Sequence, residues 1–236
     1  MIMTLIKGIL VLLLAIPLSL LALFSIPIDR TGRLYHWSAY AWSKIILRIF
    51  GIKVNVRGLE HIQNKERVIY VANHASWFDI PAMIVGIPDQ IRIVFKKELT
   101  VVPIWGWALK FGPYVEIDRS NAKDALKSLD KAAAQIRGGA SVLLFAEGTR
   151  TKDGKLQTFK RGAFALAVRS GVPVIPVAIN NSFRILPKGS LRIQPADIEL
   201  VLDRRIETEG LGGKDAERTL MDTVHQAIEK NFVEPA

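Results

Sequence analysis

The sequence predicts an α/β fold, in which a mixed, mostly parallel sheet flanked by helices follows an N-terminal membrane-associated helical segment. Two observations support this prediction. From Lys53 onward, short apolar β-branched runs alternate with segments of helical periodicity, a pattern typical of parallel strands joined by helices. Before that point, the chain is dominated by an uncharged apolar run. We therefore divide the 236 residues into a membrane-associated helical segment, 1–51, and an α/β domain, 52–236.

The apolar run extends from Gly8 to Ile28 and contains no charged residue. As a helix, it is long enough to cross a hydrocarbon core of about 30 Å. Pro17 and Pro27 permit a kink, so the sequence allows both a spanning helix and a path confined to one leaflet. A cleaved signal peptide is the alternative, but the run is long and no small-residue cleavage site follows it. We therefore expect a retained membrane segment.

Residues 29–51 have the pattern of an amphipathic helix. Apolar and aromatic side chains at helical spacing accompany positive charge, a combination typical of a helix on an anionic membrane surface. An ordinary helix that covers the domain core is the alternative. The positive charge after the apolar run also favours a cytoplasmic position for the domain that follows. The apolar set is Leu34, Trp37, Ala41, Ile45, Ile49 and Phe50, and the basic set is Arg30, Arg33, Lys44, Arg48 and Lys53.

Predicted strands and helices alternate through the rest of the chain. Pro173 and Pro176 favour an edge or irregular position for their strand, because proline gives a sheet ladder no N–H donor. The predicted strands are residues 54–56, 68–72, 91–95, a short strand within 112–119, 142–145, 172–177 and an alternating stretch through Leu191, Ile193, Ile198, Leu200 and Leu202. The predicted helices are residues 77–84, 105–111, 121–137, 163–170 and 216–232.

The most informative stretch joins the apolar strand 68–72 to the helix that follows it. His74 comes just after the strand, and Asp79 lies in the first helical turn. A strand-to-helix turn can bring the two side chains together, and a carboxylate that holds an imidazole in one tautomer makes a general base. The alternative is structural. Ser76 and Asp79 form a Ser-x-x-Asp pattern, in which Asp79 would serve only as a helix cap.

Charged residues also follow other predicted strands. Ligands of open α/β sheets bind beyond the carboxyl ends of the strands, where these residues lie. Gly148 lets the backbone approach an anion closely, and Arg150 can grip a phosphate with two N–H groups. Pairing of Arg150 with Glu147 is the alternative, because an arginine–carboxylate pair uses the same geometry. The set comprises Lys96, Lys97, Arg119, Glu147, Gly148, Thr149 and Arg150.

Composition narrows the possible functions. The chain has no cysteine, which excludes disulfides, thiolate metal sites and a cysteine nucleophile. The four histidines are scattered and suggest no ligand cluster, so we expect no metal. A net charge of +10 implies an acidic partner, which could be nucleic acid, anionic lipid or a phosphorylated substrate.

Four stretches, in order, resemble the motifs of the glycerolipid acyltransferase family, most closely the bacterial 1-acylglycerol-3-phosphate (lysophosphatidate) acyltransferases. Residues 73–79 match the Asn-His-x-x-x-x-Asp motif of that family, and the resemblance runs from about Lys53 to Asn180. Ala146 stands where the family usually has proline, a departure that leaves the charged residues intact. One short motif specifies little, whereas four in order specify much. The other three stretches are residues 112–119, 145–150 and 172–177.

The resemblance implies direct acyl transfer without a cofactor. His74, oriented by Asp79, would take the proton from the sn-2 hydroxyl of lysophosphatidate, and the oxygen would attack an acyl thioester to give phosphatidic acid. A backbone N–H group or a lysine would stabilise the oxyanion. Ser76 as an acylated nucleophile ranks lower. The implied substrate-binding residues are Lys97, Arg119, Glu147, Gly148, Thr149 and Arg150, with Glu147 orienting Arg150.

The implied partners are a phospholipid bilayer, the lysophosphatidate acceptor, and a thioester of acyl carrier protein or coenzyme A as donor. No nucleic acid is expected. The implied location is a cell membrane, an inner membrane in a bacterium, with the catalytic domain on its cytoplasmic face. Two rival functions stay open. One is a related acyltransferase for another lysophospholipid or glycerol 3-phosphate, and the other is a non-catalytic, membrane-anchored protein that binds anionic lipid.

Overall fold

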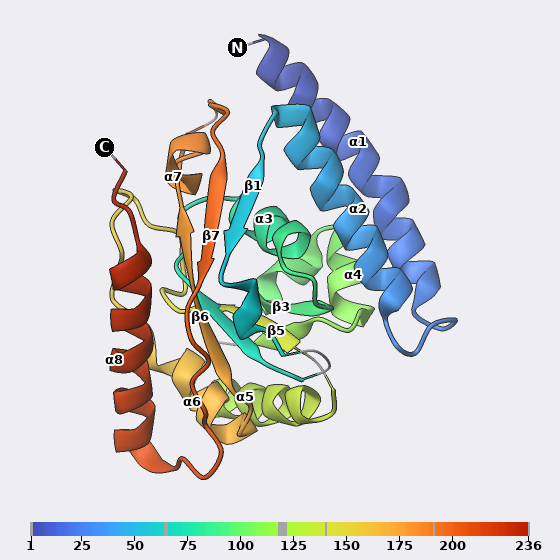
Figure 1. Cartoon of the computed structure of the whole chain (residues 1–236). Helices are drawn as coiled ribbons and strands as arrows, with labels where there is room; N and C mark the ends of the chain where they lie inside the picture. The colour runs from blue at the N-terminus through green and yellow to red at the C-terminus, as the bar shows by residue number, and fades with distance from the viewer. Residues whose placement is uncertain (1, 64–65, 118–121, 140, 191, 236) are drawn as a thin grey trace.

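A mixed sheet of seven strands forms the centre of the part of the chain that the structure describes, residues 2–63, 66–117, 122–139, 141–190 and 192–235 (Figure 1). The strands of this computed structural model are β1 (Val54–Arg57), β2 (Ile69–Ala72), β3 (Ile91–Lys96), β4 (Val115–Ile117), β5 (Ser141–Phe145), β6 (Val174–Asn180) and β7 (Ile198–Leu202). Their order is β1-β7-β6-β2-β5-β3-β4, and only the β6–β7 pair among these strands is antiparallel. The predicted fold class is confirmed.

Helices cover both faces of this sheet (Figure 1). They are α1 (Ile2–Ser25), α2 (Arg33–Phe50), α3 (Asp79–Gly86), α4 (Trp105–Phe111), α5 (Ala122–Arg137), α6 (Arg161–Ser170), α7 (Ser182–Ile185) and α8 (Gly213–Asn231), with short 3-10 helices η1 (Leu59–His61) and η2 (Lys97–Val101). In β2, Tyr70 and Ala72 join the core beneath α2, α3 and α4, whereas Ile69 and Val71 join the core beneath α5, α6 and α8. Burial on both faces explains why this strand is a continuous apolar run.

The first two helices form a hairpin against one side of the molecule (Figure 1). Residues 6–25 of α1 are long and apolar enough to cross a membrane by length and composition, and little of that stretch is buried. In contrast, α2 lies between α1 and α3. Its residues Tyr35, Ile46 and Leu47 are buried in the domain core, while Leu34 and Trp37 are exposed. The helix therefore covers the core and also presents an apolar outer surface.

Polar contacts fix the hairpin to the sheet. The carbonyl oxygen of Thr31, between the two helices, accepts hydrogen bonds from Gln90 Nε2 at 2.8 Å and from an Arg92 guanidinium nitrogen at 3.1 Å. Farther along α2, the hydroxyl of Tyr35 donates to the carbonyl oxygen of Ala108 in α4 at 3.0 Å. These contacts set the direction of α1 relative to the domain.

The strand that contains Pro176 lies inside the sheet, so of the two predicted positions the edge is wrong, whereas an irregular position agrees with the structure. β6 pairs with β2 on one side and β7 on the other. The pairing of β6 with β7 ends at Leu202, and the next bridge along β6 joins Val174 to Ile206. The N–H group that Pro176 lacks would lie in the gap between these two pairings. Its carbonyl oxygen still accepts a hydrogen bond from the amide of Asp203 at 2.9 Å. Proline is tolerated here because the partner strand has already ended.

The last strand is shorter than predicted. β7 begins at Ile198, and Ile193 has no regular secondary structure. The other residue expected at the start of this stretch, Leu191, lies outside the described residues. Pro195 lies between Ile193 and Ile198 and cannot donate to a ladder, which accounts for the late start of the strand.

Candidate active site

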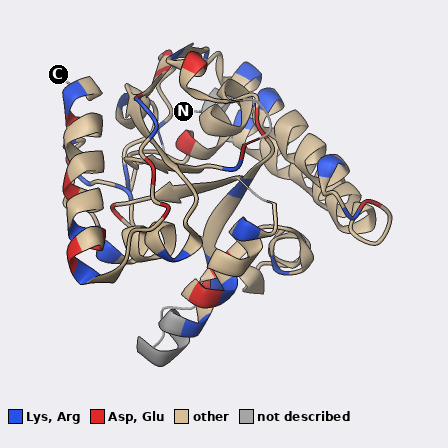
Figure 2. Cartoon of the chain, turned by 60° about the horizontal axis from the view of Figure 1, so that its bottom comes forward, with Lys and Arg blue, Asp and Glu red and all other residues tan. Residues whose placement is uncertain are grey.

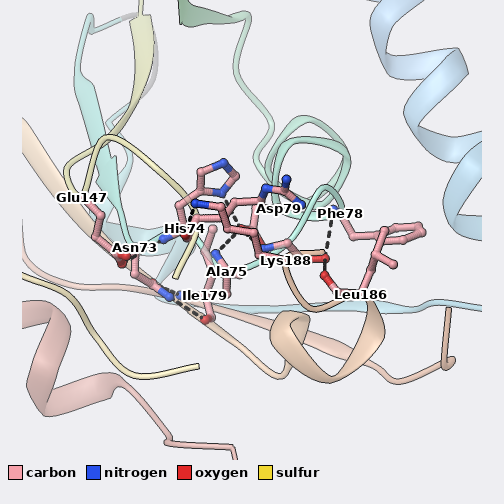
Figure 3. Close-up of polar contacts among 11 residues, drawn as sticks. Asn73, His74, Ala75, Phe78, Asp79, Glu147, Ile179, Leu186 and Lys188 are labelled. Atoms are coloured by element: carbon pink, nitrogen blue, oxygen red, sulfur yellow. Dashed lines mark hydrogen bonds and ion pairs between the residues drawn. The ribbon is translucent and has the colours of Figure 1, made fainter. Parts of the chain in front are cut away.

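Polar side chains gather where three neighbouring strands, β2, β5 and β6, come to an end (Figure 3). The parallel register places Ala72 beside Phe145 of β5 and beside Val177 of β6. His74 and Glu147 each follow the end of their strand by two residues. They therefore meet at one edge of the sheet, the edge at which α/β proteins bind ligands.

The imidazole of His74 makes the contact with Asp79 that the sequence predicts. His74 Nδ1 lies 2.7 Å from Asp79 Oδ2. The ring also stacks on Phe145, with centroids 3.9 Å apart and an angle of 17° between the planes. A hydrogen on Nδ1, donated to the carboxylate, leaves Nε2 with a lone pair in the neutral ring. The His74 side chain is 15% exposed, so the ring is partly enclosed.

Asp79 also holds the turn that precedes α3, so the structural and catalytic interpretations are compatible. Its Oδ2 accepts the backbone N–H groups of Ala75 at 2.7 Å and Ser76 at 2.9 Å, in addition to the contact with His74. The Asp79 side chain is fully buried. One carboxylate oxygen therefore fixes both the backbone of the turn and the orientation of the imidazole.

The loop after β5 encloses the backbone of His74. Glu147 Oε1 accepts the backbone N–H of His74 at 3.0 Å, and the amide of Thr151 donates to the His74 carbonyl oxygen at 2.8 Å. Gly148 permits the loop to turn, because its φ of 72° lies in the left-handed region that favours glycine. Glu147 was expected to orient Arg150, but among the described residues no ion pair joins them. The structure instead gives Glu147 a contact with the backbone amide of His74.

Burial raises the pKa of the Glu147 carboxyl group to about 8, and the nearby Asp79 and Asp153 carboxylates act in the same direction. The backbone amides of His74 and Gln157 oppose this shift only in part. Glu147 is therefore mostly protonated at neutral pH. A neutral carboxyl group can still accept the His74 N–H through its carbonyl oxygen.

Arg150 and Thr149 lie on the same loop and have partners that the sequence did not indicate. The guanidinium carbon of Arg150 lies 4.4 Å from the ring centroid of Trp77. Lys188, in the segment after α7, donates from Nζ to Thr149 Oγ1 at 2.9 Å and to the carbonyl oxygen of Arg150 at 3.3 Å. This cationic loop therefore packs beside the turn that contains His74.

The two other predicted substrate-binding residues are Lys97 and Arg119. Lys97 is exposed at the start of η2, after β3. β3 is separated from β2 by β5 in the sheet. Arg119 falls outside the described residues. Both assignments stay predictions.

Sequence reasoning missed the roles of Asn73 and Lys188. Both amide atoms of the buried Asn73 side chain bond to the backbone of Ile179, with the Ile179 N–H donating to Oδ1 at 2.7 Å and Nδ2 donating to the carbonyl oxygen at 3.0 Å. Asn73 thus ties the end of β2 to β6. A polar residue directly after an apolar strand was a usable signal for this role, whereas nothing in the sequence links Lys188 to Thr149.

An apolar cavity of about 190 Å³ adjoins the site, between the α1–α2 hairpin and the sheet. Its walls include Ala22 of α1, Tyr35 of α2, Ile80 of α3 and Trp105 of α4. Trp77 belongs to the same lining and is 55% exposed, so it lies at the edge of the cavity. An apolar chain that entered the cavity would pass close to the cationic loop.

A family model described as Acyltransferase matches residues 53–180, more than half of the chain. The chain belongs to the acyltransferase family. A 1-acyl-sn-glycerol-3-phosphate acyltransferase of Pseudomonas aeruginosa is 36% identical over 197 residues, which cover 81% of this chain and 76% of that protein. A chloroplast protein of the same description from Brassica napus is 32% identical over 186 residues, covering 78% of this chain and 54% of the relative.

The crystal structure of the 1-acyl-sn-glycerophosphate acyltransferase PlsC from Thermotoga maritima has a similar fold, with a TM-score of 0.81 at 25% identity. The alignment covers 98% of this chain and 95% of that one, so the shared fold includes the hairpin. The chain spans about half the length of its chloroplast relatives, 54% for the Brassica protein and 44% for one from Arabidopsis thaliana. Within this acyltransferase, the family match begins at β1 and includes His74, Asp79 and the loop after β5.

Replacement of Glu147 by glutamine should flatten the pH dependence of folding. The folded pKa of about 8 exceeds the unfolded value of 4.5, so the folded chain keeps a proton that the unfolded chain releases between these pH values. The free energy of unfolding therefore falls as pH rises through this window. Glu147→Gln retains an acceptor for the His74 amide and cannot ionise. Urea unfolding measured from pH 5 to 8.5 should show a shallower decline than wild type.

The exposed Glu60 provides a matched control. Glu60→Gln should keep the wild-type slope of unfolding free energy against pH. If Glu147→Gln also keeps that slope, Glu147 is not protonated in the folded chain at neutral pH.

Proposed function

We propose that this acyltransferase moves a fatty acyl group from a thioester to the sn-2 hydroxyl of 1-acylglycerol 3-phosphate and so produces phosphatidic acid. The contact between His74 and Asp79 carries the proposal, because it presents an oriented base at the ligand-binding edge of the sheet. Arg150 and the apolar cavity nearby suit an acceptor that has both a phosphate and an acyl chain. The names of the relatives support the same acceptor.

In the proposed reaction, His74 Nε2 takes the proton of the acceptor hydroxyl while the hydroxyl oxygen attacks the carbonyl carbon of the thioester. The carbon–oxygen bond forms, and a tetrahedral intermediate carries the negative charge on the former carbonyl oxygen. Collapse of the intermediate breaks the carbon–sulfur bond, and the leaving thiolate receives the proton from His74. Asp79 stabilises the imidazolium during the interval in which His74 holds that proton. Acyl carrier protein and coenzyme A both supply thioesters, and both belong in the assay as donors.

Replacement of His74 by alanine should lower kcat by about 10²- to 10⁴-fold, which is the usual contribution of a positioned general base. The measurement is the rate of thioester consumption with lysophosphatidate, with the lipid product resolved by mass. His61→Ala, in η1, is the matched control and should retain wild-type turnover. A folded His74→Ala protein with near-normal kcat would exclude His74 as the base.

Replacement of Arg150 by alanine should mainly raise KM for the phosphorylated acceptor, by about 10- to 100-fold, because a phosphate contact of this kind contributes to substrate binding. Arg119→Ala should act in the same direction. Arg184, exposed in α7, is a matched control whose replacement should leave KM unchanged. A selective rise of donor KM would remove Arg150 from the acceptor site. Comparison with glycerol 3-phosphate and other lysophospholipids as acceptors tests the related activities.

We further propose that the hairpin attaches this acyltransferase to a membrane and that the domain lies on the cytoplasmic face. Along α1, large apolar side chains such as Leu12, Leu13 and Phe24 are 69%, 60% and 69% exposed. An exposed apolar surface of this kind is typical of a membrane contact. Charged residues lie mainly near the two ends of the hairpin, which is uncharged over most of its length (Figure 2). This arrangement supports apolar anchoring with basic residues at the lipid headgroups.

The packing of α2 favours a hairpin that lies within one leaflet. Tyr35, near the start of α2, packs on Tyr114 with ring centroids 5.1 Å apart, and Phe50 at its end packs on Phe78 at 5.5 Å. The domain therefore flanks α2 from its first turn to its last. If α1 crossed the bilayer, the polar domain beside it would enter the hydrocarbon core, where unpaired polar groups are costly. A helix parallel to the surface avoids that cost.

Charges placed on the outer face of α1 should release the protein from membranes. The double replacement Leu12→Glu and Leu13→Glu changes exposed positions, so folding should persist while flotation with anionic liposomes falls. Activity should fall more on acceptor in liposomes than on acceptor in detergent. High salt should not release the wild-type chain, because salt screens charges and leaves apolar contacts intact.

Leu211→Glu is the matched control, since Leu211 is 40% exposed and lies beside α8, away from the hairpin. This variant should float like wild type. Unchanged flotation of the double variant, or recovery of the wild type in the soluble fraction, would contradict anchoring through α1.

A further inference from the structure

Trp77 occupies the variable part of the motif between His74 and Asp79, and the sequence predicts only an apolar position on a helix. In the structure, its ring lies against the guanidinium of Arg150, 4.4 Å from ring centroid to guanidinium carbon. This distance lies well within the range of a cation–π contact. We propose that Trp77 is a positioning residue that holds Arg150 in place to receive the phosphate of the acceptor, an inference that rests on the proposed function.

The indole suits this task better than a carboxylate would. A carboxylate partner would occupy the N–H groups of Arg150 and neutralise its charge, so it would compete with the phosphate. An aromatic face contacts the flat side of the guanidinium and leaves the N–H donors in its plane available. Within the described residues, no aspartate or glutamate forms an ion pair with Arg150. Glu147, the expected partner, accepts the His74 amide instead.

Trp77 and Arg150 are each held in place by contacts of neighbouring backbone groups. The residues on either side of Trp77 are buried, and the hydroxyl of Ser76 donates to the carbonyl oxygen of Leu186 at 3.2 Å. The Ser76 amide is bound to Asp79, so the carboxylate that orients His74 also fixes the backbone next to Trp77. Lys188 holds the backbone of Arg150 through a hydrogen bond to its carbonyl oxygen. The base and the phosphate-binding cation therefore share one supporting turn.

The position of Trp77 at the edge of the apolar cavity gives this contact a second consequence. The indole is part of the cavity lining and is 55% exposed, whereas Arg150 is partly buried against it. The phosphate site and the apolar site are thus separated by one aromatic ring. This arrangement favours an acceptor whose phosphate and acyl chain lie a short distance apart, which describes a lysophospholipid with a phosphomonoester.

Steady-state kinetics on the full chain in detergent micelles test the proposal, with lysophosphatidate as acceptor and an acyl thioester as donor. Trp77→Ala should raise acceptor KM by about 3- to 30-fold, the range that a cation–π contact supports. Donor KM should change little. Trp77→Phe, which keeps an aromatic face, should give an intermediate acceptor KM. Trp107→Ala is the matched control, because Trp107 is 48% exposed in α4 and is not in the cavity lining.

A double-mutant comparison separates positioning from a general structural effect. If Trp77 acts through Arg150, Trp77→Ala should add nothing to the acceptor KM of an Arg150→Ala protein. An equal added effect in that background, or an acceptor KM for Trp77→Ala and Trp77→Phe that matches wild type, would overturn the proposal. A wild-type chain that consumes no thioester with lysophosphatidate would overturn the proposed function itself, a result that is distinct from a failed Trp77 effect in an active enzyme.

Discussion

The structure of the site depends on how firmly His74 is held by segments that are distant in the sequence. Its backbone N–H is bound by Glu147, its carbonyl oxygen by the Thr151 amide, and its ring by Asp79 and Phe145. Three of these four residues belong to β5 or to the loop that follows it. The parallel pairing of β2 with β5 therefore sets the position of His74, and any change that shifts one strand against the other would move its imidazole as well.

Two buried carboxyl groups lie beside this histidine, and their surroundings give them different roles. Asp79 receives three N–H groups on one oxygen, an arrangement that suits a charged carboxylate. The hydrogen bonds of Glu147 compensate for its burial only in part, and the pKa of its carboxyl group rises to about 8. A protonated Glu147 therefore adds no negative charge to the site at neutral pH. Because the proposed acceptor carries an anionic phosphate, a neutral Glu147 would avoid an additional repulsion near Arg150.

Much of the fold could be predicted because apolar runs and helical periodicity are local properties of the chain. The pairing of His74 with Asp79 was also predictable, since five residues across a strand-to-helix turn leave few geometries. The contact of Glu147 with His74 was not predictable, because the distance between these two residues depends on the register of two strands. The edge position predicted for β6 as one of two alternatives was wrong for a related reason. Proline removes a donor, but whether that donor is needed depends on where the neighbouring strand ends.

The hairpin contributes to the apolar cavity as well as to the proposed membrane attachment. Ala15 and Leu18 of α1 and Ser38 and Trp42 of α2 line the cavity beside Trp77, so part of the proposed chain-binding surface is built from the apolar N-terminal segment. The Thr31 contacts with Gln90 and Arg92 hold that segment in register with the sheet. A lipid chain could therefore pass from a leaflet into the cavity along continuous apolar surface, while its headgroup stays near the cationic loop. Membrane position and substrate binding would then depend on the same two helices.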